Sequence, residues 1–129
     1  MIIVSEEQLD KILAEAMDEL PKTHLKAVAN VAIVWADEPT LEERRELRLA
    51  DNMTLFGLYQ GVPLAKRQGR INDYPPGKIT IYRGPIMRSV NSLAELKEQL
   101  KHTLWHEIAH YFGLDHEQIH DLEKGKPKL

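Results

Sequence analysis

The run His106-Glu107-Ile108-Ala109-His110 places two histidines and a glutamate at the spacing of a metal site on a helix. Positions i and i+4 of an α-helix lie about 40° apart around the axis and about 6 Å apart along it. Two imidazoles at that spacing can bind one tetrahedral zinc ion, with Zn–N distances of about 2.0–2.1 Å. Glu107 is rotated by about 100° from His106, so its carboxylate can accept a proton from water beside the ion. We therefore expect His106 and His110 to be zinc ligands and Glu107 to be a general base.

The next residues extend this run to H-E-x-x-H-x-x-G-x-x-H, ending at His116. Gly113 permits a sharp turn after the helix, which would bring His116 back to the ion as a third ligand. Three protein ligands leave a fourth position for water, as in catalytic zinc sites. Other donors stay open as alternatives for the third ligand: Asp115, Glu117 and His120.

Further histidines are less informative. His102 lies one helical turn before His106, and we interpret it as a solvated helix residue, with substrate contact or proton transfer as the alternative. His24 is far away in the sequence and is expected at the surface. Trp105 is expected to pack in the core.

The composition is that of an ordinary globular domain and excludes several classes of protein. The chain has 129 residues, of which 43% are hydrophobic and 29% charged. It has no cysteine, which excludes disulfides, cysteine-ligated zinc and iron–sulfur sites, and cysteine nucleophiles. With no signal-peptide pattern and no apolar run of membrane-spanning length, we expect one domain, residues 1–129, in the cytoplasm. The net charge of −3 gives no support to nucleic acid as the main partner.

Two capping boxes mark helices. Ser5-Glu6-Glu7-Gln8 and the apolar residues after it predict a helix over 5–20, which Pro21 closes. A second box begins at Ser92 and predicts a helix over 93–112, which carries the histidines and stops at Gly113.

Strands are predicted where β-branched and aromatic residues gather. These segments are residues 30–36, 55–60 and 78–83. We expect the first to be covered on both faces and the third to have one apolar side. Other segments are less defined: 41–49 is a short helix or a mobile surface loop, 66–77 a loop, and 115–123 a last helical piece. The order predicts an α+β fold with a small sheet packed against helices and the active-site helix near the C-terminus.

Segments outside the zinc pattern carry a family resemblance. They are, in order, Leu20-Pro21, Asn30-Val31, Phe56 to Leu64, and Ile79 to Arg83. With them the chain resembles short bacterial proteins of "minimal zincin" fold, described as possible zinc metallopeptidases. The resemblance implies a small sheet against two or three helices, zinc ligands at His106 and His110, and Glu107 as base. Many members carry Asp at the position of His116. The Met-turn of the larger metzincins is not expected, because no Met follows His116.

The function we expect is zinc-dependent hydrolysis of a peptide or protein substrate. Glu107 would take a proton from zinc-bound water and return it to the leaving amine. Strand 78–83 is expected at the edge of the cleft, where it would pair with an extended peptide. Tyr82 and Arg83 are candidates for stabilising the oxyanion, with structural roles as the alternative.

Two other functions stay open. Gly113-Leu114-Asp115-His116 resembles the end of the motif in bacterial rRNA-maturation endoribonucleases, and a basic loop would then bind RNA: Lys66, Arg67 and Arg70. Those enzymes lack a glutamate after the first histidine, so Glu107 argues against this function. The other alternative is a non-catalytic zinc-binding module, closed by a fourth protein ligand such as His120 or Glu117. The sequence gives no prediction of oligomeric state.

Overall fold

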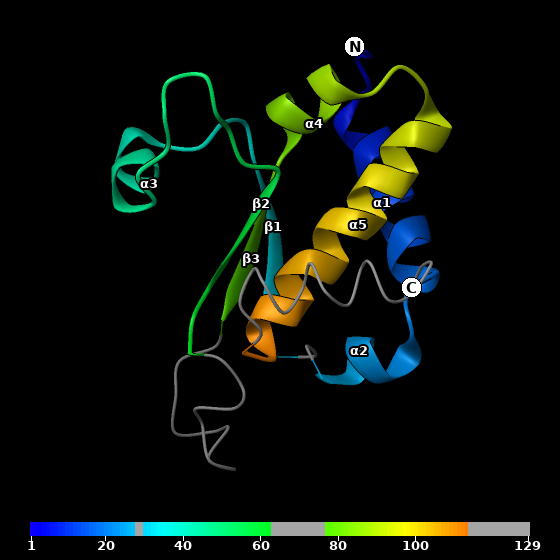
Figure 1. Cartoon of the computed structure of the whole chain (residues 1–129). Helices are drawn as coiled ribbons and strands as arrows, with labels where there is room; N and C mark the ends of the chain where they lie inside the picture. The colour runs from blue at the N-terminus through cyan, green and yellow to red at the C-terminus, as the bar shows by residue number, and fades with distance from the viewer. Residues whose placement is uncertain (28–29, 63–76, 114–129) are drawn as a thin grey trace, which may run out of the picture.

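The computed structural model of the chain describes residues 1–27, 30–62 and 77–113 (Figure 1). Its elements follow one another in this order: α1 (Glu6–Asp18), α2 (Lys22–Ala27), β1 (Ala32–Ala36), α3 (Leu41–Glu46), β2 (Gly57–Gln60), β3 (Lys78–Tyr82), α4 (Arg83–Ser89) and α5 (Leu93–Tyr111). None of the helices in these ranges combines the length and the apolar character needed to cross a bilayer.

The strands form a mixed three-stranded sheet in the order β1-β3-β2. β1 runs parallel to β3, with Ile33 opposite Ile79, and β2 runs antiparallel to β3, with Tyr59 opposite the same residue. This arrangement confirms the predicted α+β class. It also places β3 in the centre and leaves β2 as an edge strand.

Helices α1 and α5 pack together on one face of this sheet (Figure 1). Ile79 and Ile81 of β3 point to that face and are fully buried, as are Leu100 and Leu104 of α5. Trp35 of β1 also lies on this side, and its indole N–H donates to the Asp10 carboxylate of α1 at 2.8 Å. The core therefore sits between the sheet and the two longest helices, and it fixes α5 against the strands.

Two predictions about the strands were wrong. β1 is not covered on both faces, since Val34 is 38% exposed and Ala32 is exposed as well. The other face of β1, which carries Ile33 and Trp35, packs on the core. This edge strand is therefore covered on one face only, although its residues are apolar. β3 does not have a single apolar side either, because Thr80 and Tyr82 are buried together with the isoleucines between them. β3 lies between β1 and β2, and its residues from Ile79 to Tyr82 are buried on both faces of the sheet.

Both long helices lie where the sequence predicts them. Ser5 and Gln8 form the reciprocal capping box of α1. The second box is incomplete: the Ser92 hydroxyl accepts from the Glu95 N–H at 3.1 Å, but the Glu95 carboxylate binds the Asn91 N–H at 2.7 Å. Gly113 follows α5 with a φ of 93°, the left-handed conformation that glycine adopts at little cost.

The described part of the chain also has three short helices, of which only the one within residues 41–49 was among the predicted alternatives. Residues 41–49 contain α3, which Thr40 and Glu43 cap reciprocally. The helix α2 begins directly after Pro21, and α4 has Pro85 in its first turn, where proline is tolerated. Pro21 was interpreted only as the end of the helix before it. The predicted loop 66–77, except Gly77, and the predicted helical piece 115–123 lie outside the described residues.

The two complete capping boxes give a first prediction. Ser5→Ala should lower the free energy of unfolding by about 1 kcal/mol, because α1 packs on the core. Thr40→Ala removes the same kind of cap from α3, which buries no residue, so it should change global stability by less than about 0.5 kcal/mol. Urea unfolding of both variants measures the difference. Equal losses would contradict the view that α3 lies outside the cooperative core.

Candidate metal centre

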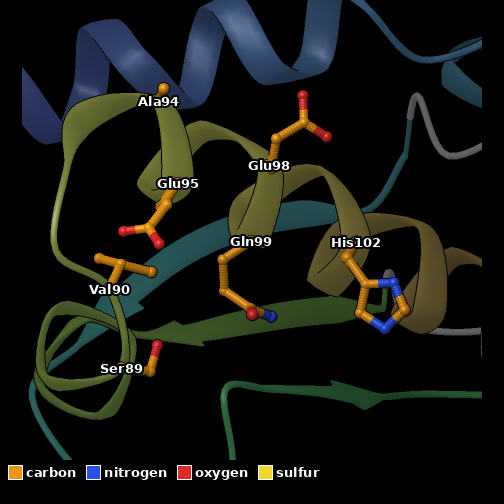
Figure 2. Close-up of a pocket in the computed structure, with 7 residues that line it drawn as sticks. All are labelled: Ser89, Val90, Ala94, Glu95, Glu98, Gln99 and His102. Atoms are coloured by element: carbon orange, nitrogen blue, oxygen red, sulfur yellow. The ribbon is translucent and has the colours of Figure 1, made fainter.

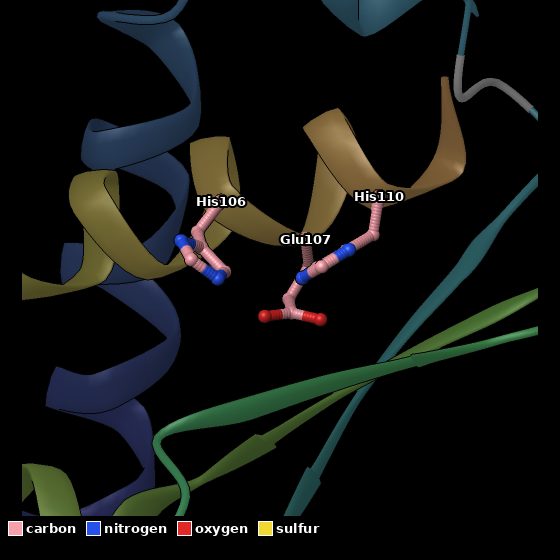
Figure 3. A group of neighbouring side chains, drawn as sticks. All are labelled: His106, Glu107 and His110. Carbon is pink, nitrogen blue, oxygen red and sulfur yellow. The ribbon is translucent and has the colours of Figure 1, made fainter. Parts of the chain in front are cut away.

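Helix α5 brings His106, Glu107 and His110 together on the side that faces β2 (Figure 3). One ligand atom from each of the three lies within 4.8 Å of the others. The two imidazole ring centres are 4.9 Å apart, and the ring planes meet at 72°. Two rings bound to one tetrahedral zinc have their centres about 5 Å apart. The donor set and its geometry therefore fit a zinc ion between the histidines.

Burial separates the glutamate from the histidines. Glu107 is 6% exposed, whereas His106 and His110 are only half-buried. Between them, Ile108 and Ala109 point into the core. The helix thus keeps two imidazoles accessible to a ligand while it holds the carboxylate against the sheet.

The partner of this carboxylate is the edge of the sheet. Glu107 Oε1 accepts a hydrogen bond from the Tyr59 backbone N–H at 2.8 Å. Phe56 accepts from the Tyr82 N–H across the β2–β3 pair, so Tyr59, three residues on, directs its N–H away from β3. The outward N–H of Tyr59 is therefore bonded by a side chain of α5.

Gly57 allows α5 and β2 to approach this closely. A Cβ atom at this position would lie 2.7 Å from Thr103 Cγ2 and 3.3 Å from Glu107 Cγ. The first distance is far shorter than a van der Waals contact between carbon atoms. A side chain at this position would require the Thr103 side chain or the helix to move.

Contacts of the Tyr59 side chain hold this residue in place. The phenol donates to the Val62 carbonyl at 3.1 Å, and the ring meets Tyr111 of α5 edge-on at 5.5 Å. A Cβ atom at Gly61 or Gly77 would lie 2.6 Å from the Tyr59 hydroxyl oxygen. The ring therefore occupies a space that two glycines leave open, which fixes the strand that supports Glu107.

Burial also sets the acidity of Glu107. It raises the pKa of the carboxyl from 4.5 to about 7, and the hydrogen bond from the Tyr59 N–H offsets part of that rise. A carboxylate with a pKa near neutrality is a stronger proton acceptor than an exposed one. The positive charge of a bound metal would lower the pKa again.

The two oxyanion candidates are placed elsewhere. Arg83 binds the Asp37 carboxylate at 2.6 Å and the Glu6 carboxylate at 3.2 Å, which ties the end of β3 to α1 and to the turn after β1. Tyr82 is fully buried, and its side chain points to the sheet face opposite that of Ile81. Burial, with the Glu43 carboxylate as a second cause, raises the pKa of the Tyr82 phenol. The structural role is the one that the contacts favour for both residues.

Several other sequence-predicted residues are not among the described ones. These residues are His116, the alternative donors Asp115, Glu117 and His120, and the basic residues Lys66, Arg67 and Arg70. The third zinc ligand therefore stays a prediction. Trp105 is buried in the core as predicted, and His102 is exposed.

Sequence reasoning missed Gly57 and Tyr59 as supports of the site. Their segment contributed to the family resemblance, but no local pattern links it to Glu107, which lies 48 residues beyond Tyr59. The glycine and tyrosine in Phe56-Gly57-Leu58-Tyr59-Gln60-Gly61 were the available signal.

Comparison with known proteins agrees with this geometry. Residues 28–126 match the model of a family described as zincin-like metallopeptidases. The chain belongs to this zincin-like metallopeptidase family. A solved structure of a conserved hypothetical protein from Thermus thermophilus has a similar fold, with a TM-score of 0.56, 15% identity, and coverage of 84% of this chain and 94% of that one. No curated protein shows significant sequence similarity to the chain.

The raised pKa of Glu107 predicts how stability of the metal-free zincin-like protein depends on pH. Between pH 4.5 and about 7 the folded carboxyl keeps a proton that the unfolded chain releases, so stability is lost as pH rises through 7. Glu107→Gln retains an acceptor for the Tyr59 N–H and cannot ionise. The free energy of unfolding of this variant, measured relative to that of wild type, should therefore rise by roughly 2–3 kcal/mol from pH 5 to pH 8. Urea unfolding in the presence of a chelator measures this difference, and a constant difference across that range would refute the prediction.

The contact at Gly57 predicts a rescue. Gly57→Ala should lower the free energy of unfolding by about 1–3 kcal/mol, because the methyl group of the new alanine overlaps Thr103 Cγ2. Adding Thr103→Ser removes that Cγ2 atom and keeps the hydroxyl that accepts from Gln99 Nε2. The double variant should therefore recover part of the loss in thermal unfolding. Additive losses would show that the clash lies elsewhere.

Proposed function

We propose that this protein is a zinc-dependent metallopeptidase in which His106 and His110 bind the metal and Glu107 is the general base. The observation that carries the proposal is the cluster of these three residues, with imidazole rings at zinc-binding separation and a carboxylate held beside them. Membership of the zincin-like metallopeptidase family supports the same chemistry. His116 is proposed as the third ligand because of its place in the extended sequence pattern.

Zinc supplies Lewis-acid chemistry, since it acidifies water and polarises a carbonyl group. The chain supplies the proton transfers. One Glu107 oxygen stays bound to the Tyr59 N–H, which keeps the carboxylate in place. The other oxygen takes the proton of the attacking water and delivers it to the nitrogen of the leaving amine.

A peptide substrate would lie along β2, not β3. The expectation that residues 78–83 form the cleft edge was wrong, because β3 is paired on both sides. β2 is an edge strand, and its outer side carries the Tyr59 N–H that meets Glu107. An extended peptide that pairs with this edge would bring a carbonyl group beside the two histidines.

The decisive experiment compares zinc-loaded wild type with Glu107→Gln on a peptide library. Hydrolysis should fall at least about 100-fold in the variant, because general base catalysis is lost while both histidines remain. Glu46→Gln makes the same chemical change on the exposed surface of α3 and should retain full activity. Metal analysis checks that all three proteins hold equal zinc.

Two outcomes would reject the proposal. Equal cleavage by wild type and Glu107→Gln at equal zinc content would remove Glu107 from the reaction. The absence of any peptide cleavage by the zinc-loaded wild type would point to one of the alternatives: a metal-binding module, or an enzyme for another substrate. Cleavage of structured RNA by the same preparation would identify that substrate.

A further inference from the structure

His102 extends the row of imidazoles on α5. It lies one helical turn before His106, is exposed, and has its ring centre 6.3 Å from that of His106, with the ring planes at 41°. His106 and His110 repeat the same i, i+4 spacing. Three imidazoles therefore follow one another along one side of the helix, and His106 belongs to two adjacent pairs.

The geometry of the first pair is close to that of a chelate. Two rings on one tetrahedral ion have their centres about 5 Å apart, so His102 and His106 need to approach by about 1 Å. His102 lies at the surface, so this approach requires a change in its side-chain rotamer and not in the backbone. Two histidines at this helical spacing are sufficient to hold a divalent transition metal.

A groove next to His102 provides a route for cations. Figure 2 shows this groove, of about 460 Å³, between α5 and the end of α4, with His102 at one end of its lining. Glu95 and Glu98 contribute two carboxylates to it. Lys97 and Lys101, the neighbouring cations of α5, are bound to Glu19 of α1 at 2.7 and 3.1 Å. Lys101 also lies 3.6 Å from the Glu98 carboxylate and offsets part of the negative charge of the groove, so Glu95 is the acidic residue of its lining that can attract a metal ion.

We propose that His102 and His106 form a second, weaker transition-metal site, which takes a divalent ion from the acidic groove and passes it to His106 and His110. The proposal rests on the metal centre proposed above. Because His106 is shared, the ion can exchange His102 for His110 while it remains bound to the chain. The second pair is the tighter site because His116 is proposed as its third ligand.

The site itself is tested by Ni²⁺ titration of His110→Ala, in which His102 and His106 are still paired. Ni²⁺ binds imidazole pairs more tightly than most divalent ions of its row. Calorimetry should find Ni²⁺ bound by His110→Ala, with an affinity at least about tenfold lower in His102→Ala/His110→Ala. Both proteins retain His106, so the difference measures His102 alone. Equal affinities would overturn the second site.

Transfer of the ion is tested by loading the metal-free protein with Co²⁺ and following its visible absorption by stopped flow. His102→Ala should reach the same final absorbance as wild type with a rate at least about threefold lower. His24→Ala removes a histidine from α2 and is the matched control, expected to load at the wild-type rate. Equal rates for wild type and His102→Ala would overturn the transfer role. If wild type takes up no Co²⁺ at all, the metal centre itself is refuted, so the two failures are distinguishable.

Discussion

The hydrogen bond between the Glu107 carboxylate and the Tyr59 N–H joins α5 to the edge of the sheet, and the arrangement of the site depends on it. A strand edge presents N–H groups without a strand partner, and an ionised carboxylate is a strong acceptor for them. Together with the buried residues of α5, the bond sets the rotation of the helix about its axis. That rotation decides the direction of His106 and His110, which lie on adjacent turns beside Glu107. The edge of β2 therefore orients the metal-binding side of the helix.

This attachment requires two kinds of packing. Gly57 brings the strand close enough for the bond to form, and the ring of Tyr59 is seated against Gly61, Gly77 and Tyr111. The enclosure that results removes water from Glu107 and makes the carboxyl less acidic. Stability and reactivity are therefore opposed at this position, because the charged form needed for proton transfer is the form that burial disfavours. A bound cation would relieve that conflict.

The sequence was informative where the signal was local. The helix over 93–112, its stop at Gly113 and the convergence of His106, Glu107 and His110 all follow from spacing within a few turns, and they are confirmed. The partner of Glu107 could not be found this way, because Tyr59 lies 48 residues earlier. The position of β3 in the sheet was missed for the same reason, since strand order is decided by pairing and not by composition. Short helices such as α4 have too few residues to show a periodic pattern.

The order of the strands also has a consequence for how the chain folds. β3 is the centre of the sheet, but it follows both of its neighbours in the sequence, and α5 follows β3. On the ribosome, β1 and β2 emerge without the strand that joins them, and α1 emerges without the helix that covers it. The Lys101–Glu19 pair closes a separation of 82 residues, so the last contacts are distant ones, and such topologies fold slowly. The histidines of the candidate metal centre are therefore added to a chain that is still incompletely folded, and a metal ion that bound them would assist the final step of folding.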